Sequence, residues 1–513
     1  MTTKRPCSAR SGPKPRPTAR AHKPQAVRDP SMQLPNHKTK IVATIGPASD
    51  SPEMLRALIE AGMNVARLNF SHGDPHYHGT LIGRIREAAA ATGRRVAIMG
   101  DLPGPKMRIG DLTEEPVELL RDDILTLTTE DIIGDKTRVS MSFLDLPAAV
   151  QPGDRLFLND GFILLKVLEV EGSEIRCSVR VGGELRSRKG LNFPGINLGI
   201  SAFTADDHGW LRFAAEHGLD AVSQSFVATD EDILAVRRAA DAIGYAPFII
   251  AKIERADALD NLEAILRAAD GIMVARGDLG VEIPIERIAV VQKQITELAN
   301  RFGKPVITAT QMLESMVTFR RPTRAEATDV ANAILGGTDC VMLSAESAMG
   351  RYPVESVAML ASIATHVEPE RSKQPFVRTM DGFHGSGRMH AVDLIAASVY
   401  HTIKDSSPQA VVVPTQSGST PRNVARFRLP VWIIAFSPNQ ATCQALQFSY
   451  GIHPIQVEAD RPDWSSFVRH WLYERGIREG LVLLTQGPTA ENPCGNYRME
   501  ILELEAASGQ RCD

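Results

Sequence analysis

Residues 251–284 read AKIERADALDNLEAILRAADGIMVARGDLGVEIP, and this stretch decides the fold of the 513-residue chain. Two apolar runs, PFIIAKIE and DGIMVARGDLG, are typical of buried strands, and a segment of helical periodicity separates them. Each run becomes charged at its C-terminal end, with Lys252 and Glu254 on the first and Arg276 and Asp278 on the second. Parallel-barrel enzymes place their chemistry at such strand ends, because the following loops converge over the barrel mouth.

The same alternation of strand and helix runs along the chain from residue 38. The expected strands are KIVATIGP, VARLNF, VAIMGDL, DAVSQSF, PFIIAKIE, GIMVARGDL, PVITATQ and CVMLSAE. Helical patterns lie between them, among them residues 52–61, 285–302 and 324–335. The last of these opens with Thr323 and Glu326 at the spacing of a capping box. Eight such units predict an α/β fold of the (β/α)8 type.

Two further domains are predicted from changes in this pattern. After the third strand the chain turns to short alternating runs, ILTLTTE, RLFLND and FILLKVLEV, which indicate a small inserted β-barrel placed to act as a lid. From about Ala391, the strands QAVVVPT, VWIIAFS, HPIQVE and GLVLLTQ indicate a second α/β domain. The expected boundaries are a tail at 1–37, a barrel at 38–106 and 204–370, a lid at 107–203 and a C-terminal domain at 371–513.

Composition indicates a protein of the cytoplasm with no membrane span. The apolar fraction of 43% and charged fraction of 23% are those of ordinary globular domains, and no run of about 18 apolar residues occurs. The cysteines have no CxxC or metal-ligand spacing, which favours a reduced compartment.

The N-terminal tail differs in charge from the rest of the chain. Residues 1–40 hold ten Lys or Arg and one acid, so they carry +9 of a net charge of −4 and leave −13 for the remainder. A basic tail rich in Pro and Ser is expected to be disordered, with a transit peptide or a nucleic-acid arm as alternatives; translation starting at Met32 is a further alternative. The acidic remainder argues against nucleic acid as the main partner.

Polar residues end nearly all of the expected barrel strands. In strand order they are Thr44; Arg67, Asn69, Ser71 and His72; Asp101; Ser225; Lys252 and Glu254; Gly277 and Asp278; Thr310; and Ser344 and Glu346. A single polar strand end is also what a turn toward solvent would give. Convergence from so many strands instead indicates a site with carboxylates, cations and hydroxyls around one mouth.

Glu254 and Asp278 are the candidate metal ligands. Mg2+ takes one or two carboxylates, keeps several waters and completes its shell with substrate phosphate. The alternative is a structural salt bridge to Arg276 or Lys252. Because Lys252 and Glu254 are two residues apart on a strand, both face the same side, and the ammonium would neutralise a phosphoryl group or an enolate oxygen. A Schiff-base lysine is the rival interpretation, which the acidic neighbour disfavours by keeping Lys252 protonated.

These motifs resemble those of pyruvate kinase. The similarity runs from about Lys38 to the C-terminus through TIGPAS, ARLNFSHG, AKIE, VARGDLGVEIP, ATQMLESM, PTRAEATDVANAI and CVMLSAES. It implies a (β/α)8 barrel with a β lid after strand three and a C-terminal α/β domain. It also implies Mg2+-dependent phosphoryl transfer from phosphoenolpyruvate to ADP, giving pyruvate and ATP, with Mn2+ as a substitute metal.

The resemblance assigns roles to individual residues. Glu254 and Asp278 would hold Mg2+, and Arg67 and Lys252 the transferring phosphate. The substrate-binding set it implies is Arg67, Ser225, Lys252, Gly277, Asp278 and Thr310. The catalytic set is Lys252, Arg67, Thr310 and Ser344, the last two for delivery of the final proton. The implied ADP/ATP contacts are Asn69, His72, Arg108 and Lys189.

The site expected for a monovalent cation departs from the commoner family pattern. Asn69, Ser71 and Asp101 are present, but Leu102 stands where a Thr is usual and Lys106 where a Glu is usual. The chain thus resembles the K+-independent branch of the family, and we expect no requirement for K+. The alternative is that Lys106 is only a surface charge. LSAESAMG also replaces the commoner LSGETAKG, which we expect to adjust packing rather than activity.

A Ser/Thr/Gly loop in the C-terminal domain is the expected effector site. The loop consists of Thr415, Gln416, Ser417, Gly418, Ser419 and Thr420, followed by a helix with Pro in its first turn. The family binds phosphorylated effectors here, and the alternative is a bare turn without a ligand. The resemblance also implies a homotetramer.

Two other functions remain as alternatives. One is a metal-dependent pyruvate aldolase or lyase on the same barrel, which would not need a lid or the nucleotide-type Arg108. The other is an inactive effector-binding homologue, which would be expected to lose Arg67, Lys252, Glu254 or Asp278; all four are present.

Overall fold

A computed structural model describes residues 34–105, 107–159, 161–196, 199–371, 390–458, 463–488 and 496–504. Most of the predicted basic tail, Met32 and Lys106 lie outside the described residues.

Eight parallel strands close into a barrel, as the sequence predicts. In chain order they are β1 (Lys40–Thr44), β2 (Val65–Asn69), β3 (Ala97–Leu102), β12 (Ala221–Gln224), β13 (Phe248–Ile253), β14 (Gly271–Ala275), β15 (Val306–Ala309) and β16 (Cys340–Leu343). Each strand pairs with its sequence neighbours, and β1 closes the ring on β16 with Lys40 opposite Cys340. Almost every strand residue is buried, because helices cover the outside and side chains fill the inside.

Helices cover the outside of the barrel. They are α1 (Pro52–Ala61), α2 (Pro75–Thr92), α4 (Ala205–Glu216), α5 (Asp230–Ala242), α7 (Leu262–Ala268), α9 (Ile288–Arg301), α10 (Arg324–Gly336) and α12 (Pro353–Arg371). The three for which the sequence gives bounds, α1, α9 and α10, lie close to the predicted residues. The capping box of α10 is confirmed: Thr323 Oγ1 accepts from Glu326 N at 3.2 Å, and Glu326 accepts from Thr323 N at 2.7 Å. The expected helix at 285–302 differs at its start, where Ile285–Arg287 is a 3-10 turn.

The segment between β3 and α4 is made of strands. They are β4 (Val117–Leu119), β5 (Ile124–Thr128), β6 (Arg138–Ser140), β7 (Arg155–Leu158), β8 (Ile163–Glu171), β9 (Glu174–Val181), β10 (Gly183–Leu185) and β11 (Leu191–Asn192). Six of them form a sheet in the order β11-β7-β8-β9-β5-β6, and β10 pairs with β4. One apolar core, with Leu125, Leu165 and Val179 fully buried, serves both sheets.

The C-terminal part is a five-stranded sheet flanked by helices. Its order is β19 (Ile452–Gln456), β18 (Trp432–Ser437), β17 (Ala410–Pro414), β20 (Gly480–Gln486) and β21 (Arg498–Leu504). The sequence predicts the four parallel strands, but not the antiparallel edge strand β21. Its helices include α14 (Ala391–Ser406), α15 (Ser419–Ala425), α16 (Gln440–Ala445) and α17 (Trp464–Glu474).

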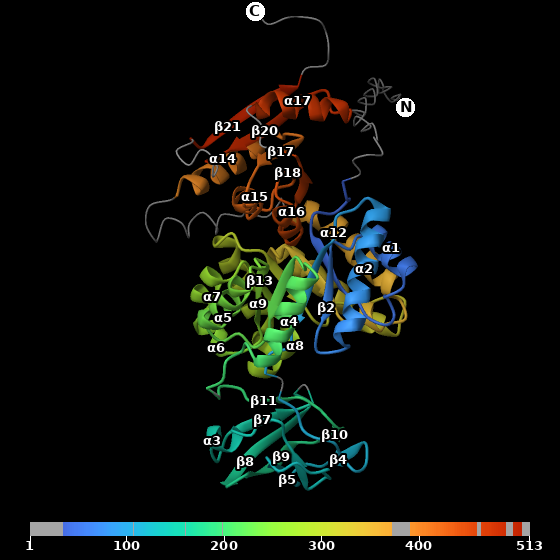
Figure 1. Ribbon diagram of the computed structural model, residues 1–513, viewed down its shortest axis with the longest axis vertical. Helices are drawn as coiled ribbons and strands as arrows, with labels where there is room; N and C mark the ends of the chain where they lie inside the picture. Colours follow the sequence, from blue (N-terminus) through green and yellow to red (C-terminus); the bar gives the residue numbers. More distant parts are fainter. Residues whose placement is uncertain are drawn as a thin grey trace, which may run out of the picture.

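The three parts lie in a row, with the barrel in the middle (Figure 1). The inserted sheets lie at one end of the barrel and the C-terminal sheet at the other. Phe448 of the C-terminal part joins the apolar cluster inside the barrel and stacks on Phe248 of β13, with ring centroids 5.4 Å apart. The C-terminal part therefore fills one end of the barrel, which leaves the other end for the polar strand ends.

A buried ion pair fastens the C-terminal part to the barrel. The Arg428 guanidinium donates to Asp339 Oδ1 at 2.6 Å and to the Gly337 carbonyl at 2.6 Å. Asp339 also accepts from the backbone nitrogens of Tyr450 and Val306. Both charged side chains are almost fully buried, so each charge is stabilised by the other in place of water.

We therefore expect Arg428→Met to destabilise the protein strongly. Removing one partner leaves Asp339 buried and uncompensated, which costs about 3–5 kcal/mol and lowers the melting temperature by roughly 10 °C. Calorimetry checks this against Arg56→Met, which removes only the exposed pair of Arg56 with Glu53. Equal melting of the two variants would contradict the role given to Arg428.

Candidate functional site

The inner wall of the barrel changes from apolar to polar toward the C-terminal ends of its strands. Alternate residues of a strand face the same side, so successive inward positions form layers. Val65 and Met99 belong to the buried cluster that Phe448 joins. Two residues further along the same strands, Arg67 and Asp101 are the inward-facing residues, and both are buried. The polar layer thus follows from strand periodicity.

Asp101 is the centre of this polar layer. Its Oδ2 accepts from Arg67 Nε at 3.2 Å and lies 3.5 Å from Lys252 Nζ. Its Oδ1 accepts from Ser223 Oγ at 2.6 Å. Arg67 is held from the other side by Thr44 Oγ1, which accepts from Nη1 at 2.9 Å. The carboxylate of Asp101 on β3 is thus in contact with side chains of β2, β12 and β13.

The charges of this cluster fix one another. Burial alone would raise the pKa of Asp101, but Lys252 and Arg67 outweigh it and hold that pKa well below its usual range. Burial would lower the pKa of Lys252, but Asp101 and Glu254 outweigh it and raise that pKa above its ordinary value. Lys252 is therefore an ammonium at neutral pH, as the sequence predicts from its acidic neighbour. A neutral Schiff-base nucleophile does not fit this environment.

Glu254 follows directly on β13 and is 3% exposed. Its Oε1 lies 2.7 Å from Lys252 Nζ, and its Oε2 accepts from Phe226 N at 2.8 Å. Lys252 also donates to Ser225 Oγ at 2.7 Å. The salt bridge considered as an alternative for Glu254 is thus present with Lys252.

Arg276, the other cation considered as a partner, has a different role. It begins α8 (Arg276–Glu282) and pairs with Asp329 at 2.6 Å. It also donates to the Thr310 carbonyl at 2.7 Å. Arg276 therefore braces the end of β15 rather than neutralising Glu254.

Asp278 lies in the first turn of α8, which follows β14, the strand next to β13. Its negative charge contributes to the raised pKa of Lys252, after the larger contributions of Asp101 and Glu254. The neighbouring Gly277 N donates to Thr310 Oγ1 at 2.7 Å. Thr310 itself has a φ of 63°, a left-handed conformation that threonine rarely adopts, so its position is held by the surrounding contacts.

At the end of β16, Ser344 and Glu346 have different surroundings. Glu346 is fully buried and accepts from the backbone nitrogens of Leu313 and Ser344, at 3.0 and 2.8 Å. That carboxylate fixes the loops after β15 and β16. Ser344 remains the candidate for chemistry at this strand end.

Two carboxylates, Glu254 and Asp278, match the number of protein ligands that Mg2+ takes. Among the described residues, no group of three or more His, Cys, Asp or Glu side chains is arranged to hold a metal on its own. Mg2+ does not need one, because it binds through one or two carboxylates and takes its other ligands from water and phosphate. Glu254 and Asp278, at the ends of adjacent strands, supply that number.

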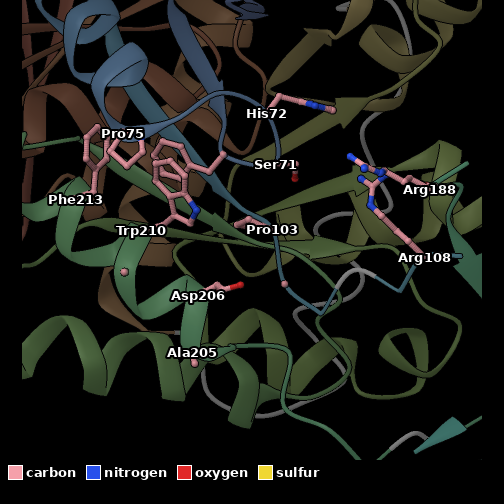
Figure 2. Close-up of a pocket in the computed structure, with 13 residues that line it drawn as sticks. Ser71, His72, Pro75, Pro103, Arg108, Arg188, Ala205, Asp206, Trp210 and Phe213 are labelled. Carbon is pink, nitrogen blue, oxygen red and sulfur yellow. The ribbon is translucent and has the colours of Figure 1, made fainter. Parts of the chain in front are cut away.

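A cavity of about 720 Å3 lies beside these strand ends, where the barrel meets the inserted segment (Figure 2). Arg108 and Arg188 approach it from the inserted side, and the carbonyl of Arg188 accepts from Arg108 Nη1 at 2.9 Å. Ser71, Pro103 and the ring of Trp210 line the barrel side. The cavity thus combines two guanidinium groups, of which Arg188 also pairs with Asp111, with an aromatic wall and the carboxylate of Asp206.

Two of the four predicted nucleotide contacts, His72 and Arg108, line this cavity. Asn69 and Lys189 are not among its lining residues; Asn69 Oδ1 accepts from Ser71 N, and the Lys189 carbonyl accepts from Ile109 N. Arg188, next to Lys189, does line it.

Two of the predicted monovalent-cation residues, Leu102 and Asp101, are poorly suited to hold a cation. Leu102 is fully buried and ends β3. Both oxygens of Asp101 already have partners, as described above. Lys106 lies outside the described residues.

The predicted effector loop joins β17 to the short helix α15. Thr415 Oγ1 accepts from Gly418 N at 2.9 Å, and Gly418 has a φ of 78°. The Ser417 carbonyl accepts from Arg422. The loop, which includes Ser419 and Thr420, is thus a closed turn next to a cation.

Comparison with known proteins identifies the class of this barrel. A family model described as "Pyruvate kinase, barrel domain" matches residues 36–357, and one described as "Pyruvate kinase, alpha/beta domain" matches residues 393–493. The chain belongs to the pyruvate kinase family, and it is a phosphotransferase with the function of that family.

Curated relatives agree over nearly the whole chain. The pyruvate kinase of Thermococcus litoralis is 45% identical over 478 residues, which are 92% of this chain and 100% of that protein. The pyruvate kinases of Clostridium acetobutylicum and Geobacillus stearothermophilus are each 42% identical, covering 82% and 92% of this chain and 88% and 82% of theirs. No helix among the described residues is long and apolar enough to cross a membrane.

Sequence reasoning missed three residues of this site. Ser223 was in reach, because it is two residues before Ser225 on one strand and so faces the same side. Arg188 lies in a run of basic residues that gives no hint which one faces the cavity. Trp210 lines the cavity from α4, but in a sequence a single aromatic residue on an amphipathic helix is more simply interpreted as a core residue.

Proposed function

We propose that the cluster around Lys252 transfers the phosphoryl group of phosphoenolpyruvate to ADP, giving pyruvate and ATP. One observation supports this most strongly: a buried ammonium lies at the barrel mouth between Asp101 and Glu254, within the field of Asp278. Phosphoryl transfer needs positioning and charge stabilisation more than covalent help. Neither an aldolase nor an inactive homologue accounts for this cluster together with the cationic cavity.

Each residue of the cluster has a role in this proposal. Arg67 and Lys252 hold the transferring phosphate, and Lys252 then stabilises the charge that develops on the enolate oxygen. Ser225 fixes the Lys252 ammonium through the 2.7 Å hydrogen bond. Gly277 N and Thr310 Oγ1, now bonded to each other, would position the substrate carboxylate.

Glu254 and Asp278 would hold Mg2+, or Mn2+ in its place. The ion, when bound, supplies positive charge that neutralises the phosphate and carboxylate of the substrate. Thr310 and Ser344 lie at neighbouring strand ends and are proposed to pass the final proton to the enolate through water.

We further propose that the cavity binds ADP and ATP, with His72 and Arg108 as contacts and Asn69 and Lys189 close by. Arg188 joins them as a cation for the phosphates. Because the cavity has walls from both the barrel and the inserted segment, closure of that segment would exclude water, which competes with ADP for the phosphoryl group.

K+ is proposed to be dispensable. Leu102 offers no side-chain oxygen, and Asp101 already accepts from Ser223 and Arg67. On the family resemblance alone, Lys106 is proposed to replace the cation.

The loop from Thr415 to Thr420 is proposed to bind a phosphorylated activator, a sugar phosphate or a nucleotide monophosphate. Its support is the run of hydroxyls next to Arg422. We also propose a cytoplasmic location, which is supported by the free, buried Cys177, Cys340 and Cys443 among the described residues. A homotetramer is proposed from the family resemblance alone.

Lys252→Met tests the central proposal. Loss of the ammonium removes the charge that stabilises the enolate, so kcat is expected to fall by at least about 1000-fold. A coupled assay of ADP phosphorylation with Mg2+ measures it, with Lys293→Met on the outer helix α9 as the control. Turnover near the wild-type value would refute the role of Lys252.

The proposal on K+ predicts equal rates with and without potassium. The assay is run in potassium-free buffer, and KCl is compared with tetramethylammonium chloride at equal ionic strength. We expect a change below about twofold, because Leu102 offers no side-chain oxygen and both oxygens of Asp101 already have partners. A many-fold gain that only KCl gives would overturn the proposal.

The effector proposal predicts that one phosphorylated compound lowers the half-saturating phosphoenolpyruvate concentration. Sugar phosphates and AMP are titrated at subsaturating phosphoenolpyruvate, on wild type and on Ser417→Asp, whose added charge repels a phosphate. An unchanged half-saturation for every compound with the wild type would rule the site out.

A further inference from the structure

His78 is a buried histidine that has no role in the proposed phosphoryl transfer. It lies in the first turn of α2 and is 2% exposed. Its ring is surrounded by aromatic rings, with centroids 5.2 Å from Phe70, 5.4 Å from Tyr77 and 5.6 Å from Trp210. All three contacts are edge-to-face, which fixes the orientation of the imidazole.

The imidazole makes one directed hydrogen bond out of this cage. Its Nε2 lies 2.8 Å from the carbonyl oxygen of His72. A carbonyl only accepts, so Nε2 carries the proton. Burial lowers the pKa of His78, which leaves the ring neutral with a single N–H. Among the residues that the structure describes, its buried Nδ1 has no hydrogen-bond partner, so the ring's one polar contact there is with the His72 carbonyl.

The segment that receives this bond carries a proposed nucleotide contact. It runs from β2 to α2 and turns sharply, with His72 N donating to Asn69 O at 3.1 Å and Gly73 at a φ of 79°. A Cβ on Gly73 would lie only 3.2 Å from His78 Nε2, so the turn closes directly over the imidazole. On its other side, the turn lines the cavity with Ser71 and His72.

We infer that His78 is a positioning residue for the nucleotide: its hydrogen bond to the His72 carbonyl fixes the turn that presents His72 to the cavity. This inference rests on the proposed role of His72 as a nucleotide contact. His78 is not among the residues that line the cavity. Its effect is therefore confined to the affinity for ADP and does not reach the phosphoryl-transfer cluster.

The experiment separates the hydrogen bond from the packing. His78→Phe keeps a planar ring in the aromatic cage but removes the donor, and His78→Gln keeps an N–H near the position of Nε2. The control is His217→Phe, because His217 stacks on Phe213 in the same aromatic cluster and its Nδ1 bonds the Phe213 carbonyl of the preceding helix. Melting temperatures verify folding, and His78→Leu replaces the Phe variant if that does not fold.

For His78→Phe we expect the KM for ADP to rise about tenfold, the usual effect of losing one buried hydrogen bond. The KM for phosphoenolpyruvate and kcat stay within about twofold. His78→Gln recovers most of the affinity, and His217→Phe behaves as wild type.

Three outcomes would overturn the inference. They are an unchanged KM for ADP in His78→Phe, an equal loss for both substrates, and a Gln variant as weak as the Phe variant. His72→Ala is measured alongside. If it leaves the KM for ADP unchanged, the proposed role of His72 fails; if it raises that KM while His78→Phe does not, only the role of His78 fails.

Discussion

The site depends on one buried carboxylate that binds two cations. Asp101 accepts from Arg67 and faces Lys252, and neither cation would be stable in the barrel interior without it. With Glu254 included, two positive and two negative charges balance in the free protein. Asp278 adds a further negative charge that acts on Lys252, so the cluster has no positive charge in excess. In the proposed reaction, a divalent metal held by Glu254 and Asp278 would supply the positive charge that a dianionic phosphate needs.

This arrangement is possible because the two ends of the barrel differ. At one end, Phe448 from the C-terminal part fills the interior, and the Arg428–Asp339 pair ties that part to β16. Stability is thus concentrated away from the reaction. At the other end, the strands finish in charged residues and strained turns such as the one at Thr310. Backbone strain of this kind costs about 1–3 kcal/mol, and a rigid scaffold compensates for it.

The sequence predicts the fold well because strand and helix periodicity is local. It places the eight barrel strands, three of the inserted strands (β5, β7 and β8) and the capping box of α10 correctly, and strand-end polarity collects Arg67, Asp101, Lys252 and Glu254. It does not show which partner each charged side chain has. Arg276 pairs with Asp329, 53 residues further along the chain, and Glu346 accepts hydrogen bonds from backbone nitrogens. It also misses β21, because the alternation of apolar and polar residues in RMEILEL is too weak to distinguish a strand from an irregular C-terminal segment. Such choices depend on tertiary neighbours that a single sequence does not name.

The two connections of the inserted segment meet at one residue. Asp207, fully buried in the first turn of α4, accepts from Gly104 N at 3.1 Å on the outgoing connection and from Thr204 N at 2.8 Å on the returning one. A capping carboxylate thus ties both connections together at the base of the inserted segment. Asp206 and Trp210, on the same helix, line the cavity that Arg108 and Arg188 reach from the inserted side. The insert is therefore anchored at a fixed base on the wall of the cavity, so a movement about that base would change the distance between the cations and the strand ends while leaving the Asp101 cluster unchanged.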